Sequence, residues 1–280
     1  MSGHQYTGLV NVNKPSGMTS RAAVDRVARV VSPSRAGHAG TLVCVGSATR
    51  LISISQQLPK RYRARFRLGY RSDTDDVTGE ITPVEVAEKV TRPRLEGLLS
   101  RFVGRIEQVP PQYSAVHVDG RRAYELARRG ETAELKAKTV EVYRLDLVAF
   151  DYPEIELEIE CGSGTYVRAI GRDLGEQLGC GAVMSALERT HIGSFCVDEG
   201  VDPEQLAAES PAEWLLPAAA AVAHLPQYVC AADEVEEIRH GRRFACRAPA
   251  GLGEDQPIAV LTAAGELACL ARVHREDGTL

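Results

Sequence analysis

Residues 61–68 alternate between arginine and apolar side chains, and this pattern constrains the fold more than any other in the chain. Arginine occupies each odd-numbered position, and the positions between them hold Tyr62, Ala64, Phe66 and Leu68. Side chains of a strand point alternately to its two faces. The segment therefore predicts a strand with one face in a core and the other face covered by guanidinium groups.

The arginine face has two interpretations. Arginine is permanently charged and its planar fork matches phosphate oxygens, so the face suits a polyanion. A solvated basic face on an ordinary amphipathic strand is the alternative. Lys14, in the turn-rich residues 13–20, offers the same choice between a phosphate contact and a solvated lysine.

Charge is distributed unevenly along the 280 residues, whose net charge is −5. Lys and Arg outnumber Asp and Glu by 24 to 15 in residues 1–150, and are outnumbered by 23 to 9 in residues 151–280. A hydrophobic content of 44% is ample for a packed core. The first half is therefore the candidate anion-binding part of a globular protein.

The cysteines and the N-terminus bear on the compartment. Seven cysteines are scattered without a C-x-x-C spacing, which indicates neither a disulfide framework nor a zinc site. The N-terminus lacks a signal-peptide pattern, and no window approaches the roughly 18–20 apolar residues that span a bilayer. We expect a cytoplasmic protein without a membrane segment.

Hydrophobic spacing predicts a succession of strands and helices. The expected strands cover residues 8–12, 61–68, 139–150 and 154–161, and the glutamates that alternate through the last of these are expected to face solvent. Helices are expected after the capping hydroxyls at 19–20, over 92–102, after Gly120, within 161–175 and over the alanine-rich 218–224. Composition changes beyond about residue 200, which predicts a domain of residues 1–216 and a small β-rich domain of residues 217–280.

Two short motifs have ordinary explanations. The acidic residues 72–80 are interpreted as a turn with local hydrogen bonds, because the glycine and the distal glutamate do not fall at the positions of a calcium loop. Gly162 and Gly164 suggest a dinucleotide site only weakly, because Val167 occupies the third glycine position. Tyr166 and Arg168, two residues apart, are better candidates for a ring and a cation that face one cavity.

Seven motifs, taken together and in this order, resemble the TruB-type tRNA pseudouridine synthases. They cover roughly residues 8–195 and read A-G-H-A-G-T-L, K-R-Y-R-A-R-F-R-L-G, R-S-D-T-D-D-x-x-G, P-P-Q-Y-S-A, G-R-R-A-Y-E-L-A-R-R-G, G-T-Y-V-R and D-L-G-E-Q-L-G-C-G-A. Each motif alone would be weak, whereas the colinear set is specific. The resemblance implies an α+β pseudouridine synthase fold with a mixed, largely antiparallel sheet, flanking helices and a small C-terminal domain.

The resemblance also implies an activity and its residues. A T-loop uridine of tRNA, at position 55, would be flipped from its stack and isomerised to pseudouridine without a cofactor or metal. By motif position, His38 would support the flipped nucleotide, Tyr62 would stack on the uracil and assist proton removal at C5, and Tyr166 and Leu187 would line the pocket. Arg168 would pair with the nucleophilic aspartate, and Lys14, Arg61 and Arg63 would contact the RNA backbone. The expected partner is the tRNA T-arm, bound by a monomer.

The nucleophilic aspartate itself is missing. In the family, G-T-L is followed by D-P-L-A-x-G-x-L and an apolar strand, whereas here Leu42 runs directly into Val43-Cys44-Val45. Val43 occupies the nominal position of the aspartate, and an alkyl group can neither attack the nucleoside nor stabilise charge. Arg168 is then expected to be an unpaired cation, and Asp73, Asp75 or Asp76 could replace the aspartate only if the backbone reorganised.

Three hypotheses follow. The first is a tRNA pseudouridine synthase whose recorded sequence has lost a short in-frame segment, and the second is an inactive member that binds tRNA and helps it fold. Both predict salt-sensitive tRNA binding by the basic first half. The third is a protein-interaction module that uses the acidic second half, which a lack of tRNA binding at moderate salt would favour.

Overall fold

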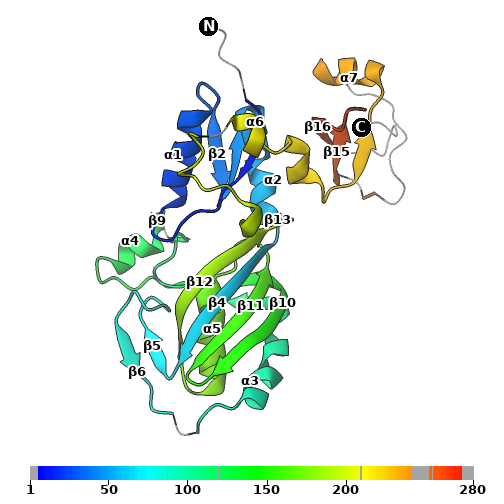
Figure 1. Cartoon of the computed structure of the whole chain (residues 1–280). Helices are drawn as coiled ribbons and strands as arrows, with labels where there is room; N and C mark the ends of the chain where they lie inside the picture. The colour runs from blue at the N-terminus through cyan, green and yellow to red at the C-terminus, as the bar shows by residue number, and fades with distance from the viewer. Residues whose placement is uncertain are drawn as a thin grey trace. The chain divides into compact units, whose positions relative to one another are not determined.

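The arginine-alternating segment forms β4 (Lys60–Leu68), which confirms the predicted strand and lies inside an antiparallel sheet. The strand order is β13-β12-β4-β11-β10-β7. Figure 1 shows β12, β4, β11 and β10 side by side. The other strands are β7 (Gly104–Gln108), β10 (Lys138–Asp151), β11 (Glu154–Cys161), β12 (Ala182–Ile192) and β13 (Phe195–Cys196).

The chain divides into two compact units. Unit 1 comprises Met1–Gln56 and Val197–Leu280, and unit 2 comprises Gln57–Cys196. The division into domains of residues 1–216 and 217–280 stays a prediction. The computed structural model describes residues 6–86, 88–118, 120–208, 210–240, 242, 252–253 and 255–272.

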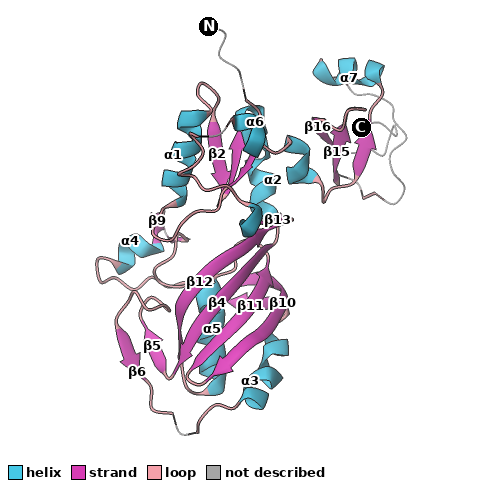
Figure 2. Ribbon diagram, in the orientation of Figure 1, coloured by secondary structure: helices cyan, strands magenta, loops and turns pink. Residues whose placement is uncertain are grey.

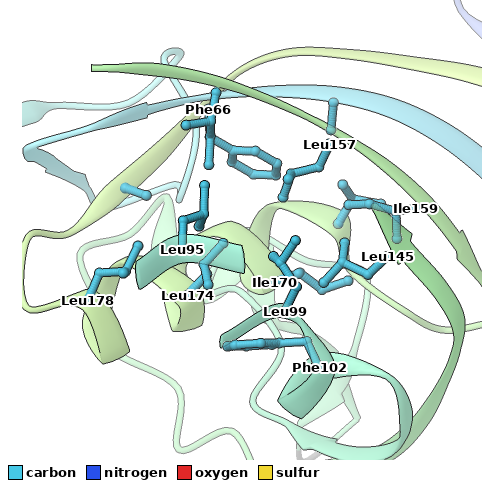
Figure 3. Close-up of a cluster of buried hydrophobic side chains, with 14 of the residues drawn as sticks. Phe66, Leu95, Leu99, Phe102, Leu145, Leu157, Ile159, Ile170, Leu174 and Leu178 are labelled. Carbon is cyan, nitrogen blue, oxygen red and sulfur yellow. The ribbon is translucent and has the colours of Figure 1, made fainter. Parts of the chain in front are cut away.

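Two helices cover one face of the sheet in unit 2, α3 (Arg92–Leu99) and α5 (Val167–Leu178) (Figure 2). The apolar face of β4 meets them, and Phe66 lies among Leu95, Leu157 and Leu174 in a continuous core (Figure 3). Gly171 lets α5 approach closely, because a Cβ atom there would lie 2.0 Å from the Phe66 ring. The predicted periodicities therefore define the core of this unit.

The other face of the sheet carries a ladder of ion pairs. The register sets the glutamates of β11 beside the arginines of β4, and Glu156 accepts from both Arg63 and Arg65 at 3.2 and 2.9 Å. Arg61 pairs with Glu160 at 3.2 Å, and Arg67 with Glu154 at 3.6 Å. The expectation that these glutamates face solvent was wrong for Glu156, whose side chain is 15% exposed, because each strand supplies the counter-charges of its neighbour.

Smaller elements of unit 2 connect the strands. A short helix and a two-stranded ribbon follow the P-P-Q-Y-S-A segment, and a second ribbon flanks the acidic residues 72–80. The elements are β5 (Tyr70–Ser72), β6 (Ile81–Pro83), η2 (Ser100–Phe102), β8 (His117–Val118), β9 (Arg121–Arg122) and α4 (Ala123–Ala127).

The N-terminal part of unit 1 is a sheet of order β1-β3-β2 on which α1 packs. Gly40 and Thr41 join β2 to β3 directly, since Ala39 pairs with Leu42. Gly40 has a φ of 78°, as a two-residue hairpin requires. Thr19 caps α1 through Ala22 N, as the sequence predicted. The elements are β1 (Gly8–Asn11), α1 (Ser20–Val30), β2 (Ala36–Ala39), β3 (Leu42–Val45), η1 (Gly46–Leu51) and α2 (Ile52–Gln57).

The C-terminal part of unit 1 contains a three-stranded sheet in which β14 is parallel to β15 and β15 antiparallel to β16. The expected alanine-rich helix is a 3₁₀ helix over Ala218–Val222. Among the described residues, no helix is long and apolar enough to cross a membrane. The elements are η3 (Val197–Glu199), α6 (Pro211–Trp214), η4 (Ala218–Val222), β14 (Gln227–Val229), α7 (Ala232–Arg239), β15 (Pro257–Leu261) and β16 (Leu267–Arg272).

Candidate active site

A cavity of about 260 Å³ opens in unit 2 where β4, β12 and the start of α5 meet. The structure brings Tyr62, Tyr166, Arg168 and Leu187 together there, although they lie far apart in the sequence. Drug-sized ligands occupy pockets of roughly 300–1,000 Å³, so this cavity suits a smaller group. The remaining lining residues, which the sequence did not identify, are Thr165, Val167 and Met184.

Arg168 is paired, which overturns the expectation of an uncompensated cation. Its Nη1 donates to Asp76 Oδ2 at 2.8 Å, and its Nη2 donates to the carbonyl of Tyr113. The Arg168 and Asp76 side chains are 20% and 13% exposed. The guanidinium can be held in a half-buried pocket because the acidic turn supplies a carboxylate.

The Asp76 carboxylate is saturated with hydrogen bonds. Its Oδ1 accepts from the backbone N–H of Thr78 at 3.0 Å, from the Thr78 hydroxyl and from the Thr74 hydroxyl at 2.9 Å. Burial raises the pKa of this carboxyl, but the hydrogen bonds from Thr78, Arg168 and Thr74 together outweigh burial, and the pKa lies below its ordinary value. Asp76 is therefore ionised and fixed, which suits it to orient Arg168 rather than to attack a substrate.

A second pair, Arg172 with Asp75, lies one helical turn further along α5. Arg172 Nη1 donates to Asp75 Oδ2 at 2.9 Å, and its Nη2 donates to the Val109 carbonyl at 2.8 Å. Burial raises the pKa of the Asp75 carboxyl, although Arg172 and Arg168 act in the opposite direction. The acidic turn is also bonded to β12, because Met184 N donates to the Asp75 carbonyl at 3.0 Å.

Tyr62 presents a neutral ring to the cavity. Burial raises the pKa of its phenol, although the positive charge of Arg189 acts in the opposite direction. The hydroxyl is therefore protonated at neutral pH. A protonated phenol can stack and donate, whereas it is a poor proton acceptor.

Three residues named from the sequence lie in unit 1 and are described there alone. His38 on β2 pairs in register with Val43 on β3, and its Nδ1 atom is buried without a hydrogen-bond partner among the described residues. Val43 is 0% exposed and packs in the cluster of Val10, Val24 and Val45. The nominal position of the aspartate is thus a core position. Lys14 Nζ donates to the Pro15 carbonyl at 3.2 Å.

Exposed arginines also gather on a short arm of unit 2, formed by β8, β9, α4 and the residues that follow to Gly130. Arg122 and Arg128 lie over the Tyr124 ring, at 6.0 and 5.6 Å from its centroid. Unlike the arginines of β4, those of the arm form no ion pair with another described residue. They are Arg121, Arg122, Arg128 and Arg129.

No group of three or more metal-ligating side chains occurs in the described part of the chain.

Solved structures share the fold over nearly the whole length of this chain. A chain from the crystal structure of a Cbf5-Nop10-Gar1 complex has a TM-score of 0.74 and 24% identity, covering 95% of this chain and 78% of that one. A chain from the archaeal box H/ACA sRNP Nop10-Cbf5 complex has a TM-score of 0.72 and 23% identity, covering 97% and 80%. The chain therefore has the α+β pseudouridine synthase fold that the motifs implied.

Sequence comparisons define the family. Residues 28–167 match the model of the TruB family pseudouridylate synthase N-terminal domain, and residues 168–222 match the tRNA pseudouridylate synthase B C-terminal domain. The tRNA pseudouridine synthase B of Trichormus variabilis is 39% identical over 253 residues, covering 85% of each chain. That of an Arthrobacter species is 39% identical over 284 residues, covering 94% of this chain and 92% of the relative. The chain belongs to the TruB family of pseudouridylate synthases, which are isomerases.

Proposed function

We propose that this chain binds the T-arm of tRNA and flips the uridine at position 55 into the cavity beside Tyr62. This capture precedes isomerisation to pseudouridine, which we assign to the form of the protein that carries the aspartate loop. The observation that carries the proposal is the cavity itself, in which Tyr62, Tyr166 and Leu187 surround the oriented guanidinium of Arg168. A base inside a helical stack cannot reach such a cavity, so it must leave the stack. The family membership supports RNA as the substrate.

Each cavity residue has a distinct part in this proposal. The neutral ring of Tyr62 stacks on the uracil, and Tyr166 and Leu187 close the sides of the pocket. Asp76 holds the Arg168 guanidinium in one orientation, in which hydrogen bonds to Asp76 and Tyr113 already use its two terminal nitrogens. The role of His38, which the resemblance implies, stays a prediction.

The RNA backbone is bound by exposed cations. Binding phosphate breaks no ion pair between described residues at the four exposed arginines of the arm, Arg121, Arg122, Arg128 and Arg129. Arg61 and Arg63 must share or exchange their glutamates to bind phosphate, since both are paired on the sheet. Their contact with RNA, and that of Lys14, stays a prediction.

Isomerisation breaks the bond from ribose C1′ to uracil N1 and forms a bond from C1′ to C5, while C5 loses a proton and N1 gains one. A carboxylate at the nucleoside is needed for this exchange. None of the described residues that line the cavity carries a carboxylate, and Asp76 already accepts four hydrogen bonds.

The missing carboxylate supports a second candidate function, a protein that binds tRNA and promotes its folding without turnover. The observation in its favour is the β2–β3 hairpin, which Gly40 and Thr41 close where the family has its aspartate loop. Both candidates share capture of the T-loop uridine. Only turnover distinguishes them.

The test measures release of tritium from an unmodified tRNA transcript labelled at uridine C5. This chain should release none, whereas a version with D-P-L-A-S-G-V-L-V inserted after Leu42 should release about one equivalent per tRNA. The control is the same insertion with Asn in place of its Asp. Tritium release by the uninserted chain would contradict the role of the missing loop. Absence of tRNA binding at moderate salt by both versions would overturn the proposed function and favour a protein-interaction module.

A further inference from the structure

The segment from Gln108 to Tyr113 runs beside the start of α5 and is bonded to it at three residues. The Tyr113 carbonyl accepts from Arg168, and the Val109 carbonyl accepts from Arg172 at 2.8 Å. The third attachment is the Gln108 side chain, which binds the backbone of Tyr166. Gln108, Val109 and Tyr113 therefore hold the start of α5, whereas the side chain of Gln112 bonds elsewhere.

Gln108 is buried and uses both ends of its amide on one residue. Its Oε1 accepts from Tyr166 N at 2.8 Å, and its Nε2 donates to the Tyr166 carbonyl at 3.1 Å. The residue is only 1% exposed. Two hydrogen bonds to the same backbone unit restrict its position and its rotation. A buried glutamine needs hydrogen-bond partners for its amide, but these could belong to different residues. Here both partners belong to the backbone of Tyr166.

Tyr166 needs this support because it is the N-cap of α5. It has extended backbone angles, φ −99° and ψ 106°, and no side chain within the helix caps the first turn. In a capping box, a Glu or Gln side chain at the third helical position bonds the N–H of the cap residue, and this position is Ala169 in α5. Here the bonds come from β7, 58 residues away in sequence.

We infer that Gln108 is a positioning residue that fixes the Tyr166 ring at the wall of the cavity and so sets the affinity for the captured base. The inference rests on the proposed function. Without the clamp, Tyr166 N–H loses its partner and the N-cap can rotate, so the ring no longer forms one wall of the cavity. Contacts of the RNA backbone with the arginine arm do not depend on Gln108.

The chain offers a matched control in Gln112. Its Nε2 donates to the Ala133 carbonyl at 3.0 Å and its Oε1 accepts from Ala133 N at 3.1 Å, which is the same two-bond clamp on a residue that does not line the cavity. Replacing either glutamine with methionine removes a similar pair of bonds. Only the Gln108 change should alter capture of the base.

The experiment compares the affinity of the full chain for two T-arm stem-loop RNAs, one with uridine at position 55 and one abasic there. The ratio of the two dissociation constants isolates the contribution of the base from that of the backbone. Stacking on aromatic side chains predicts a ratio of about tenfold or more for the unaltered chain. Gln108→Met should lower the ratio to about twofold and leave the affinity for abasic RNA unchanged, and Gln112→Met should keep the ratio of the unaltered chain.

Gln108→Glu provides a rescue. A protonated carboxylic acid presents the same acceptor and donor as the amide, and burial favours this form. The ratio for this variant should approach that of the unaltered chain at pH 5 and fall at pH 8. If circular dichroism shows that Gln108→Met is unfolded, the pH dependence of Gln108→Glu tests the inference instead. A ratio unaffected by Gln108→Met, or lowered equally by Gln112→Met, would overturn the inference. A ratio of one for the unaltered chain would instead contradict the proposed function.

Discussion

Arg168 Nη1 lies 2.8 Å from Asp76 Oδ2, and this pair joins α5 to the acidic turn at the edge of the cavity. The sequence provided an arginine without its expected aspartate, yet the fold supplies a different one. Four hydrogen bonds hold that carboxylate in place. The arginine that lines the cavity therefore has a fixed orientation in this chain.

Stability should depend on pH through Asp76. The folded-state pKa of Asp76 lies below its ordinary value, so the stabilisation is complete above about pH 4 and is lost as the pH falls through the folded pKa. Asp76→Asn should be less stable at pH 7 and should lack this part of the acid-induced loss. Urea unfolding between pH 2 and 7 measures both effects.

Asp25→Asn is the control, because Asp25 is a solvent-exposed carboxylate paired with Arg21. Exposed ion pairs contribute about 0–1 kcal/mol, so this change should leave the acid limb of the stability profile in place. An acid limb that is the same in Asp76→Asn and in the unaltered chain would contradict the assignment to Asp76.

Replacing Val43 with aspartate should not restore turnover. Val43 is fully buried among apolar side chains, and burying an ionised carboxylate there should cost about 4 kcal/mol or more. Val43→Ala, which only removes methyl groups, should cost about 2 kcal/mol. Urea unfolding should therefore separate the two variants, and neither should release tritium from labelled tRNA. Turnover by Val43→Asp would show that the loop is dispensable.

The two groups of arginines should differ in their effect on RNA binding. Arg128→Ala on the arm should lower the slope of log affinity against log salt by about one, because a free cation that binds phosphate releases counterions. Arg65→Ala should have a smaller effect, since Arg65 is held at 2.9 Å by Glu156, a carboxylate that it shares with Arg63 and would have to leave to bind phosphate. Binding of unmodified tRNA over a range of salt concentrations tests this, and equal slopes for both variants would contradict it.

The sequence predicted those features that depend on local periodicity. The alternation in β4 and the heptad-like spacing in α1 and α3 report which side chains are buried, and the structure confirms these elements within a few residues. The motif order also identified four residues that meet in the cavity. Periodicity and spacing carry this information because they describe one element at a time.

Relationships between elements could not be read in this way. The pairing of Arg63 and Arg65 with Glu156 depends on the register of β4 against β11, which no local pattern specifies. The same holds for Arg168 with Asp76, separated by 92 residues, and for Gln108 with Tyr166. Nothing in the sequence around Gln108 indicates that its side chain bonds the backbone of Tyr166.

The ring of Tyr62 should matter more for capture of the base than its hydroxyl. Tyr62→Phe keeps the ring that lines the cavity, so the ratio of affinities for uridine and abasic RNA should stay within about twofold of the unaltered chain. Tyr62→Ala should lower that ratio about tenfold, because the stacking surface is lost. A large loss of base capture in Tyr62→Phe would contradict the stacking role, because only the hydroxyl differs between the two side chains.

The Tyr62 hydroxyl is expected to assist proton removal at C5. In the version that carries the inserted aspartate loop, Tyr62→Phe should therefore slow tritium release. Burial raises the pKa of this phenol, so a hydroxyl that must ionise to remove the proton should make the rate of tritium release rise with pH through the neutral range. Equal rates for Tyr62→Phe and the tyrosine form would contradict this role.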